Sequence, residues 1–302
     1  MSNIRVVSAL LCHRDISMAL KCLGSLVKMN KCKLEIVFQI HDDGTLTESD
    51  KEALHSNLPI LKIIDRNTAD NTVNDLLSKY PNCLKYRQKQ IYALKLFDVP
   101  LLSNTEEVVY VDSDVLFIQP FENLFQLPSP EATCIFMQDF YNSYAVYPWH
   151  IVFKPISLPK RLNCGLFIIN KSKFYSLDFL EWLIAQEIPA YYRFPWFEQT
   201  AWGALAMESK NAYFWDSDQV TCVKNIHSIN NQTIAAHFTS PVRGLMNHFE
   251  MNILSNKKII AHTLQMERLG VIGLTQTFAN RYMNNKIYTI KKLFHQTVLQ
   301  NP

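Results

Sequence analysis

The stretch EEVVYVDSDVLF, residues 106–117, carries the strongest structural signal in the sequence. Residues 108–111 form a continuous run of β-branched and aromatic side chains, which is typical of a strand covered on both faces. Asp112 and Asp114 follow this strand directly. Because ligands bind beyond the carboxyl ends of strands in an open α/β sheet, both carboxylates are predicted to lie at a crevice. There they can ligate one divalent cation that also binds phosphates. The alternative is an ordinary strand-end turn with solvated acids.

The segments before this stretch alternate between strand and helix patterns. Strands are predicted over residues 4–12, 34–40 and 61–64. Helices are predicted over residues 16–29 and 86–97, and a further helix is predicted to begin after a cap at Thr45 or Thr47. This alternation favours an α/β fold with a mostly parallel sheet and helices on both faces.

The chain continues with the same kinds of element after the two carboxylates. A turn is predicted at residues 163–165 and a buried strand from there to Lys171. Helices are expected over residues 173–185 and from about Glu198, and strands over residues 212–215 and 233–238. No repeat or Gly/Ser linker marks a domain boundary.

Composition narrows the class of protein. The chain has 302 residues, is 48% hydrophobic and 19% charged, and carries a formal net charge of +3. That charge is too small to predict nucleic-acid binding. Seven scattered cysteines without a CxxC pair indicate reduced thiols, and no apolar run approaches the roughly 20 residues of a membrane span. We therefore expect a cytoplasmic protein.

Four short motifs resemble, in their order, those of the retaining glycosyltransferases of family 8, the group of glycogenin and the bacterial lipopolysaccharide galactosyltransferases. They are YVDSDVLF, NCGLFIIN, FEQTAWGAL and HFTSPVR. The resemblance spans most of the chain and implies the Rossmann-like GT-A fold with a helical C-terminal segment. It also implies transfer of a hexosyl group, with retention, from a nucleotide-diphosphate sugar such as a UDP-sugar to a carbohydrate or lipid-linked glycan.

The resemblance also implies roles for single residues. Asp112 would hold the donor ribose and the metal, and Asp114 and His237 would complete the metal ligands. Asn163 and Gly165 would contact the donor sugar, and Lys95 the donor phosphates or sugar. Glu198 and Gln199 correspond to the acidic-Gln pair beside the reacting carbon of the donor. Arg243 takes the place of a lysine in the family segment and is expected to bind a phosphate oxygen.

The expected cofactor is Mn²⁺ or Mg²⁺. Imidazole ligation by His237 favours Mn²⁺, because nitrogen ligands suit the later transition metals. The alternative for His237 is a core histidine paired with a backbone carbonyl. At the end of the first strand, Cys12, His13 and Arg14 replace the family's usual Asp and Asn, so the nucleotide base is not predicted from that strand.

We predict one GT-A domain over residues 1–250, with a nucleotide-binding half (1–115) and an acceptor and sugar half (116–250). Residues 251–302 are expected to form a helical extension. Basic and apolar residues alternate within residues 274–299, which indicates either a packed terminal helix or a basic amphipathic helix at the cytoplasmic face of a membrane.

Three alternatives remain open on the sequence alone. Asp216-Ser217-Asp218 repeats the Asp-x-Asp pattern after another aromatic strand, although it falls at the wrong place in the order of motifs. A phosphohydrolase of the haloacid dehalogenase type also uses Asp-x-Asp at a strand end. A non-catalytic nucleotide-sugar binder would share the same pocket.

The aromatic residues of 140–149 and 191–202 can either stack on acceptor sugars or belong to the core.

Overall fold

The computed structural model describes residues 4–31, 34–146, 156–186, 197–249, 258–280 and 282. Its strands are β1 (Ile4–Leu11), β2 (Glu35–Asp42), β3 (Leu61–Ile64), β4 (Glu107–Val111), β5 (Val115–Phe117), β6 (Phe121–Glu122), β7 (Cys134–Gln138), β8 (Leu162–Asn170), β9 (Ala212–Trp215), β10 (Val220–Cys222), β11 (Ala235–His237), β12 (Ile259–Ile260) and β13 (Thr263–Gln265). Its helices are α1 (Ile16–Met29), α2 (Glu48–Asn57), α3 (Arg66–Leu76), α4 (Pro81–Lys89), α5 (Ala93–Leu101), α7 (Lys171–Phe174), α8 (Leu177–Ala185) and α9 (Phe197–Ser209).

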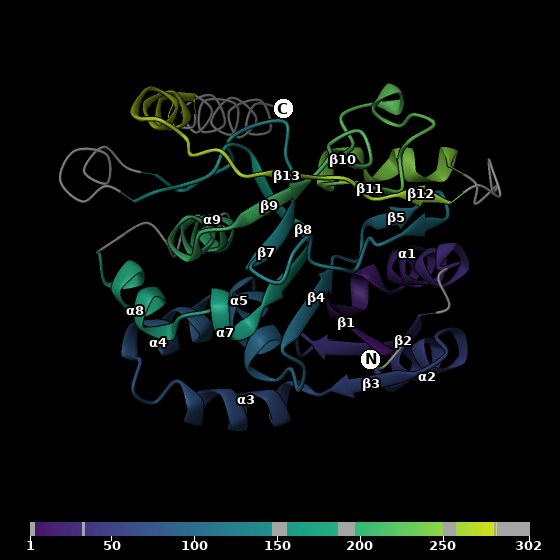
Figure 1. The fold of residues 1–302 in the computed structure, drawn as a ribbon. Coiled ribbons are helices and arrows are strands. Elements are labelled where there is room, and N and C mark those ends of the chain that lie inside the picture. Colours follow the sequence, from purple (N-terminus) through teal and green to yellow (C-terminus); the bar gives the residue numbers. More distant parts are fainter. Residues whose placement is uncertain are drawn as a thin grey trace, which may run out of the picture.

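One curled sheet organises the described part of the chain. Its strand order is β3-β2-β1-β4-β8-β7-β10-β11-β5, and β9 and β13 branch off from β7. Most neighbours run parallel, whereas β8 is antiparallel to both β4 and β7. Figure 1 shows α4, α8 and α9 on one side of this sheet and α1 and α2 on the other. The predicted α/β class, with a mostly parallel sheet flanked by helices, is confirmed.

The buried run before Asp112 explains why the sheet is covered on both sides. Side chains of β4 alternate between two cores, because successive residues of a strand point to opposite faces. Val108 and Tyr110 belong to the core shared with α4, α5, α8 and α9, and Val109 and Val111 to the core shared with α1 and α2. Both faces of β4 are therefore buried, and the polar residues that follow it lie at the edge of the sheet where the strands end.

The helix predicted over residues 86–97 is two helices. Residues 90–92 form a turn between α4 and α5, and Arg87 of α4 bonds Asp98 of α5 at 2.7 Å with both side chains buried. In one continuous helix these two residues would lie about 16 Å apart, at 1.5 Å of rise per residue. The turn thus permits a buried ion pair that a straight helix excludes.

Two further sequence predictions need correction. Residues 173–185 are divided between α7 and α8, because the Ser176 side chain accepts a hydrogen bond from the Phe179 amide and caps a new helix. Asn163, Cys164 and Gly165 lie within β8 rather than in a turn, at a point where the register with β7 shifts. This irregularity is the part of β8 that lies beside Asp112.

The last described segment combines strands and helix. β12 pairs with β6 and β13 with β9, and residues 271–280 are helical. The two strands thus precede the helix within the extension predicted over residues 251–302. Most of the segment 274–299 lies outside the described residues. No described helix has the length and apolar character needed to cross a membrane.

Candidate active site

The candidate metal ligands meet because of strand register. The chain leaves β4, turns at residues 112–114 and enters β5, which runs antiparallel to β11 with Val115 opposite His237. This register puts the imidazole beside the turn, and the Phe238 amide also donates to the Asp114 carbonyl at 2.9 Å. Ligand atoms of Asp112, Asp114 and His237 all lie within 4.8 Å of one another. This is the one group in the described residues that brings three such ligands together.

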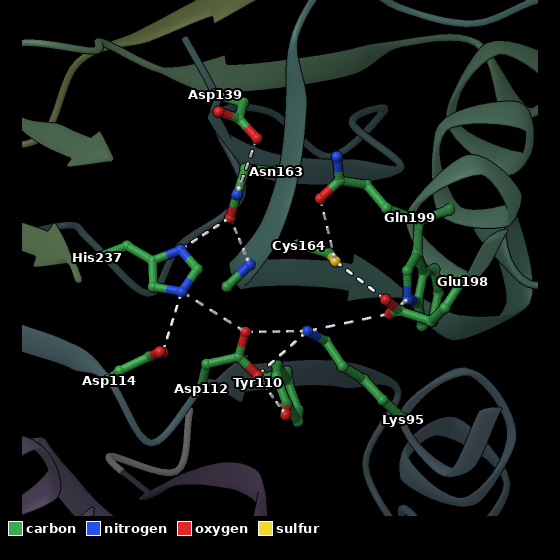
Figure 2. Close-up of polar contacts among 12 residues, drawn as sticks. Lys95, Tyr110, Asp112, Asp114, Asp139, Asn163, Cys164, Glu198, Gln199 and His237 are labelled. Carbon is green, nitrogen blue, oxygen red and sulfur yellow. Dashed lines mark hydrogen bonds and ion pairs between the residues drawn. The ribbon is translucent and has the colours of Figure 1, made fainter. Parts of the chain in front are cut away.

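The imidazole of His237 faces both carboxylates through one nitrogen. Its Nε2 lies 3.0 Å from Oδ1 of Asp114 and 3.9 Å from Oδ2 of Asp112 (Figure 2). Burial alone would disfavour a charged His237, but the Asp114 carboxylate outweighs burial and holds the pKa of His237 well above its ordinary value. Without a metal, a proton on Nε2 therefore bridges this nitrogen to Asp114.

The other imidazole nitrogen is fixed by Asn163. Its Oδ1 accepts from the Gly165 amide at 2.8 Å and lies 3.0 Å from Nδ1 of His237, while its Nδ2 donates to Asp139 at 3.3 Å. With Oδ1 facing the ring, Nδ1 must carry a hydrogen. Nε2 is then left to face the carboxylates, which is how partners of metal-binding histidines set the tautomer.

Gly165 gives the imidazole its room. A Cβ built at this position would lie 2.4 Å from Nδ1 of His237. No ordinary side chain fits there, so a glycine at position 165 is a requirement of the site and not of a turn.

Lys95 and Tyr110 hold the Asp112 carboxylate from the side opposite the imidazole. The ammonium of Lys95 lies 3.1 Å from both oxygens of Asp112, and the Tyr110 hydroxyl donates to Oδ1 at 2.7 Å. The same ammonium lies 4.6 Å from the centre of the Tyr110 ring. Burial would lower the pKa of Lys95, but Asp112, together with Cys164, Glu198 and Tyr110, outweighs burial and holds that pKa well above its ordinary value. Lys95 is therefore a fixed positive charge.

Arg243 holds Asp114 in a similar way. It lies in the 3₁₀ segment Ser240–His248, and its Nε and one terminal nitrogen donate to Oδ2 of Asp114 at 2.9 and 2.8 Å. Its other terminal nitrogen lies 3.6 Å from Asp15. Burial opposes ionisation of Asp114, yet His237 and Arg243 lower its pKa to about 2. The Asp114 carboxylate is thus ionised and held between two cations, His237 and Arg243.

Glu198 and Gln199 lie at the start of α9, beside the irregular part of β8. The Cys164 thiol donates to Glu198 at 3.2 Å and lies 3.8 Å from Oε1 of Gln199 (Figure 2). The Trp202 indole also donates to Glu198, and the Lys95 ammonium lies 3.9 Å from it. Burial raises the pKa of Glu198, against the opposing charge of Lys95. Glu198 is therefore a buried acid surrounded by protein donors.

All nine sequence-predicted site residues lie in this connected region, and five more contribute that the sequence reading did not include. Tyr110 is two residues before Asp112, and Trp202 is four residues after Glu198, so strand and helix periodicity would have placed both on the right face. Asp15 and Asp139 gave no such signal, because their contacts depend on which loops the fold brings together. Cys164 lies in β8, and its contact depends on the irregular register of that strand.

The residues fit a divalent ion. Asp112 and Asp114 each keep one oxygen toward Nε2 of His237, and Nδ1 of that ring is held by Asn163. To bind two carboxylates and an imidazole, one ion needs ligand atoms that converge on a single point. It also needs the second imidazole nitrogen to be held by a hydrogen bond, as Asn163 holds Nδ1 here. The three side chains are therefore a credible ligand set.

Comparison with known proteins shows the fold and not the family. No protein-family model matches the sequence, and no curated protein matches it either. The structure is similar to the galactosyltransferase LgtC in complex with donor and acceptor sugar analogs, at 12% identity and a TM-score of 0.52, over 78% of this chain and 88% of that one. It is also similar to mouse xyloside xylosyltransferase 1, at 14% identity and a TM-score of 0.51, over 79% of this chain and 99% of that one. The chain thus has the predicted GT-A fold.

Proposed function

We propose that this protein is a metal-dependent retaining glycosyltransferase of the family 8 type. It would move a hexosyl group from a nucleotide-diphosphate sugar, preferably a UDP-sugar, to a hydroxyl of a carbohydrate or lipid-linked glycan. The observation that carries the proposal is the convergence of Asp112, Asp114 and His237 at the carboxyl edge of the sheet. The GT-A fold and the order of the four sequence motifs support it.

In this proposal Asp112, Asp114 and His237 hold Mn²⁺, or Mg²⁺ as the second choice. A bound divalent ion neutralises the charge that develops on the departing nucleotide diphosphate. Asp112 also contacts the ribose, and Arg243 binds a phosphate oxygen from the far side. Arg243 is bonded to Asp114 in this structure, so it already lies at the ligand group.

Four residues beside the proposed metal ligands are assigned to the donor sugar and its phosphates. Asn163 and Gly165 contact the donor sugar, and Lys95 contacts the phosphates or the sugar. Gln199 stabilises positive charge at the anomeric carbon through its amide oxygen. The bond from that carbon to the donor phosphate breaks, the acceptor oxygen binds on the same face, and the departing phosphate takes the acceptor proton.

Glu198 supports this reaction by positioning its neighbours and not by transferring a proton. Its carboxylate receives donors from Cys164 and Trp202 and lies near the Lys95 ammonium, so it is not free to remove a proton from an acceptor. We propose that Glu198 orients the Lys95 side chain and the first turn of α9. A general base would instead need a carboxylate within hydrogen-bond reach of the acceptor hydroxyl.

The transferase is assigned to residues 1–250, divided near residue 115, and the segment 274–299 to contact with an anionic membrane surface in the cytoplasm. Phe278 and Tyr282 stack at 6.1 Å, and exposed Val271 and Ile272 extend the same apolar character. Removing residues after Asn285 should reduce sedimentation with anionic liposomes and leave turnover on a dissolved acceptor unchanged. Loss of folded protein would instead identify a packed core helix.

The direct test is thermal stability and turnover with a panel of nucleotide sugars, with and without Mn²⁺. A ligand that binds the folded state raises the unfolding temperature. We expect one UDP-sugar to stabilise the protein when Mn²⁺ is present, and chelator to remove both stabilisation and turnover. Stabilisation without turnover on any acceptor would indicate a non-catalytic binder. Release of inorganic phosphate from phosphomonoesters would indicate a hydrolase.

A further inference from the structure

The loop after β7 is anchored on the candidate active site at two points. Oδ2 of Asp139, at its start, accepts from Nδ2 of Asn163 at 3.3 Å. The Ser143 carbonyl, near its end, accepts from Nε2 of Gln199 at 3.1 Å. Residues 140–142 therefore lie between a contact to the proposed sugar-binding residue and a contact to the proposed catalytic residue.

The loop is also fixed to the start of β8. The Asp139 amide donates to the Arg161 carbonyl at 2.6 Å, and the Arg161 amide donates to the Asn142 side chain at 2.9 Å. The Leu162 amide donates to the Tyr144 hydroxyl, also at 2.9 Å. These bonds hold the backbone on both sides of residues 140 and 141, so little conformational entropy remains to be lost when a ligand binds there.

The fixed loop exposes two aromatic rings. Phe140 is 37% exposed and Tyr141 is 64% exposed. Most other large apolar side chains of the described residues are buried, in a chain that is 48% hydrophobic. Aromatic rings offer a large, rigid contact surface at low entropic cost, and flat apolar faces of sugar rings fit such surfaces. An exposed pair beside an active site is thus well suited to a glycan.

A cation from a second element completes the same surface. The Lys224 ammonium lies 5.9 Å from the centre of the Tyr141 ring. Lys224 follows β10, in which Cys222 lies opposite His237 of β11. Two routes therefore connect the surface to the site: one through Asn163, and one through β10, which pairs with the strand that bears His237.

The charge of this surface is positive and available. In the part of the chain that the structure describes, neither Lys224 nor Arg161 forms an ion pair, whereas their neighbour Lys160 bonds Glu267. The carboxylate of Asp139, in the same loop, already accepts from the Phe140 amide at 2.7 Å and from Asn163. The Lys224 ammonium lies beside the Tyr141 ring, and the second exposed cation belongs to Arg161, whose backbone bonds the loop. This charge favours a sugar that carries negative charge.

We propose that Phe140, Tyr141, Arg161 and Lys224 form the acceptor subsite, and that it selects a sugar bearing a carboxylate or a phosphate. The inference rests on the proposed glycosyltransferase function, which it deepens by naming the class of acceptor. The rings receive the apolar face of the acceptor sugar, and the two cations receive its anionic group.

The test measures binding without donor or metal, so it does not depend on turnover. Dissociation constants are determined by ligand-observed NMR for three octyl β-glycosides that share ring and tail: the glucoside, the glucuronide and the glucoside 6-phosphate. We expect the two charged ligands to bind about two- to fivefold more tightly than the glucoside, the range of an exposed ion pair. The preference should shrink as salt is added. The two charged arms distinguish a carboxylate from a phosphate.

Two variants locate the subsite. Lys224→Ala should remove most of the preference for charge and leave glucoside binding unchanged, and Tyr141→Ala should weaken all three ligands by about two- to tenfold. Lys79→Ala, an exposed lysine after α3, is the matched control and should change nothing. Equal binding of the charged and neutral glycosides, or an unchanged preference in Lys224→Ala, overturns the proposal. Failure of Mn²⁺-dependent turnover alone would overturn the transferase function and leave this binding result intact.

Discussion

The chain contains the tripeptide Asp-Ser-Asp twice, each time directly after a strand with aromatic residues. The two copies differ in the side chains that contact their carboxylates. At residues 112–114 the carboxylates meet His237 and are held by Lys95 and Arg243. At residues 216–218 the chain forms an exposed turn after β9, in which the Asp216 side chain accepts from the Asp218 amide at 3.0 Å. Within the described residues, no cation pairs with the second copy.

The difference shows that the tripeptide does not make the site. The first turn lies between β4 and β5, and β5 pairs with the strand that ends in His237. The second turn connects β9 to β10 at the part of the sheet where β9 branches off from β7. An Asp-x-Asp pattern therefore predicts a ligand site only when the topology brings an imidazole and cations to it.

The largest expected effect separates the two copies directly. Asp114→Asn should reduce Mn²⁺-dependent turnover by about 10³-fold or more, because it removes a ligand and an anion that Arg243 and His237 require. Stability should fall by about 1–3 kcal/mol, since Arg243 and His237 lose a charged partner. Asp218→Asn should stay within about 0.5 kcal/mol and retain full turnover. Steady-state kinetics and urea unfolding measure both, and equal losses in the two variants would mean that the second turn binds the metal.

The next effect concerns the residues that only the first copy has beside it. Gln199→Ala should lower turnover by about 10²-fold with an intact fold, the scale of removing one preorganised electrostatic group. Glu198→Gln should be milder, because its neighbours Cys164 and Trp202 remain in place. Proton NMR should show an α-linked product from an α-linked donor. A β-linked product, together with an inactive Glu198→Gln variant, would make the enzyme inverting and Glu198 its base.

A glycine substitution sharpens the comparison at the imidazole. In Gly165→Ala the new methyl group meets His237, so the ring must move away from Asn163 and from the turn. We expect a loss of about 1–3 kcal/mol in unfolding free energy and of about 10- to 100-fold in Mn²⁺ affinity. Gly24→Ala is the control, because nothing lies within 4 Å of a Cβ there and the residue is inside α1. That variant should gain about 0.5–1 kcal/mol and bind Mn²⁺ normally.

The last prediction concerns the pH range in which the two turns are compared. Burial lowers the pKa of His41, on β2, from its ordinary value of 6.5 to about 3. As pH falls below 6.5 the unfolded chain takes up this proton before the folded protein does, so stability is complete above 6.5 and is lost toward pH 3. The slope contributed by this one group approaches about 1.4 kcal/mol per pH unit. Urea titrations across this range should show a shallower slope for His41→Gln, and an unchanged slope would exclude His41 as the source.

The sequence predicted the elements that have continuous patterns. The bounds of α1, β3 and β9 agree with the predicted ranges, because a long amphipathic repeat and short β-branched or aromatic runs leave little choice. The helices split at residues 90–92 and at Ser176 could not be separated by periodicity, since a buried ion pair and a cap decide the break. These are contacts of the folded chain, and they have no local period.

For the candidate site, the sequence predicted which residues to consider but few of the contacts between them. Asp112 and Asp114 follow from strand burial, and the other predicted residues came from the resemblance. That Asn163 fixes the His237 tautomer depends on residues 74 positions apart, and the bond of Cys164 to Glu198 depends on the irregular register of β8. Such contacts follow from topology, which the pattern of single elements does not determine.

The bond between Arg243 and Asp114 joins residues 129 positions apart, and this separation has a consequence during synthesis. A ribosome makes β1 to β4 first, so the two acids of the first turn emerge long before His237 and Arg243 exist to receive them. Protein synthesis adds about 5–20 residues per second, which leaves these acids without their partners for roughly 6–26 seconds. Under the proposed function, a divalent ion would find only part of its ligand set during that interval and would not stabilise the nascent chain. Metal capture would then be a late event, and it would mark a chain whose translation has passed β11.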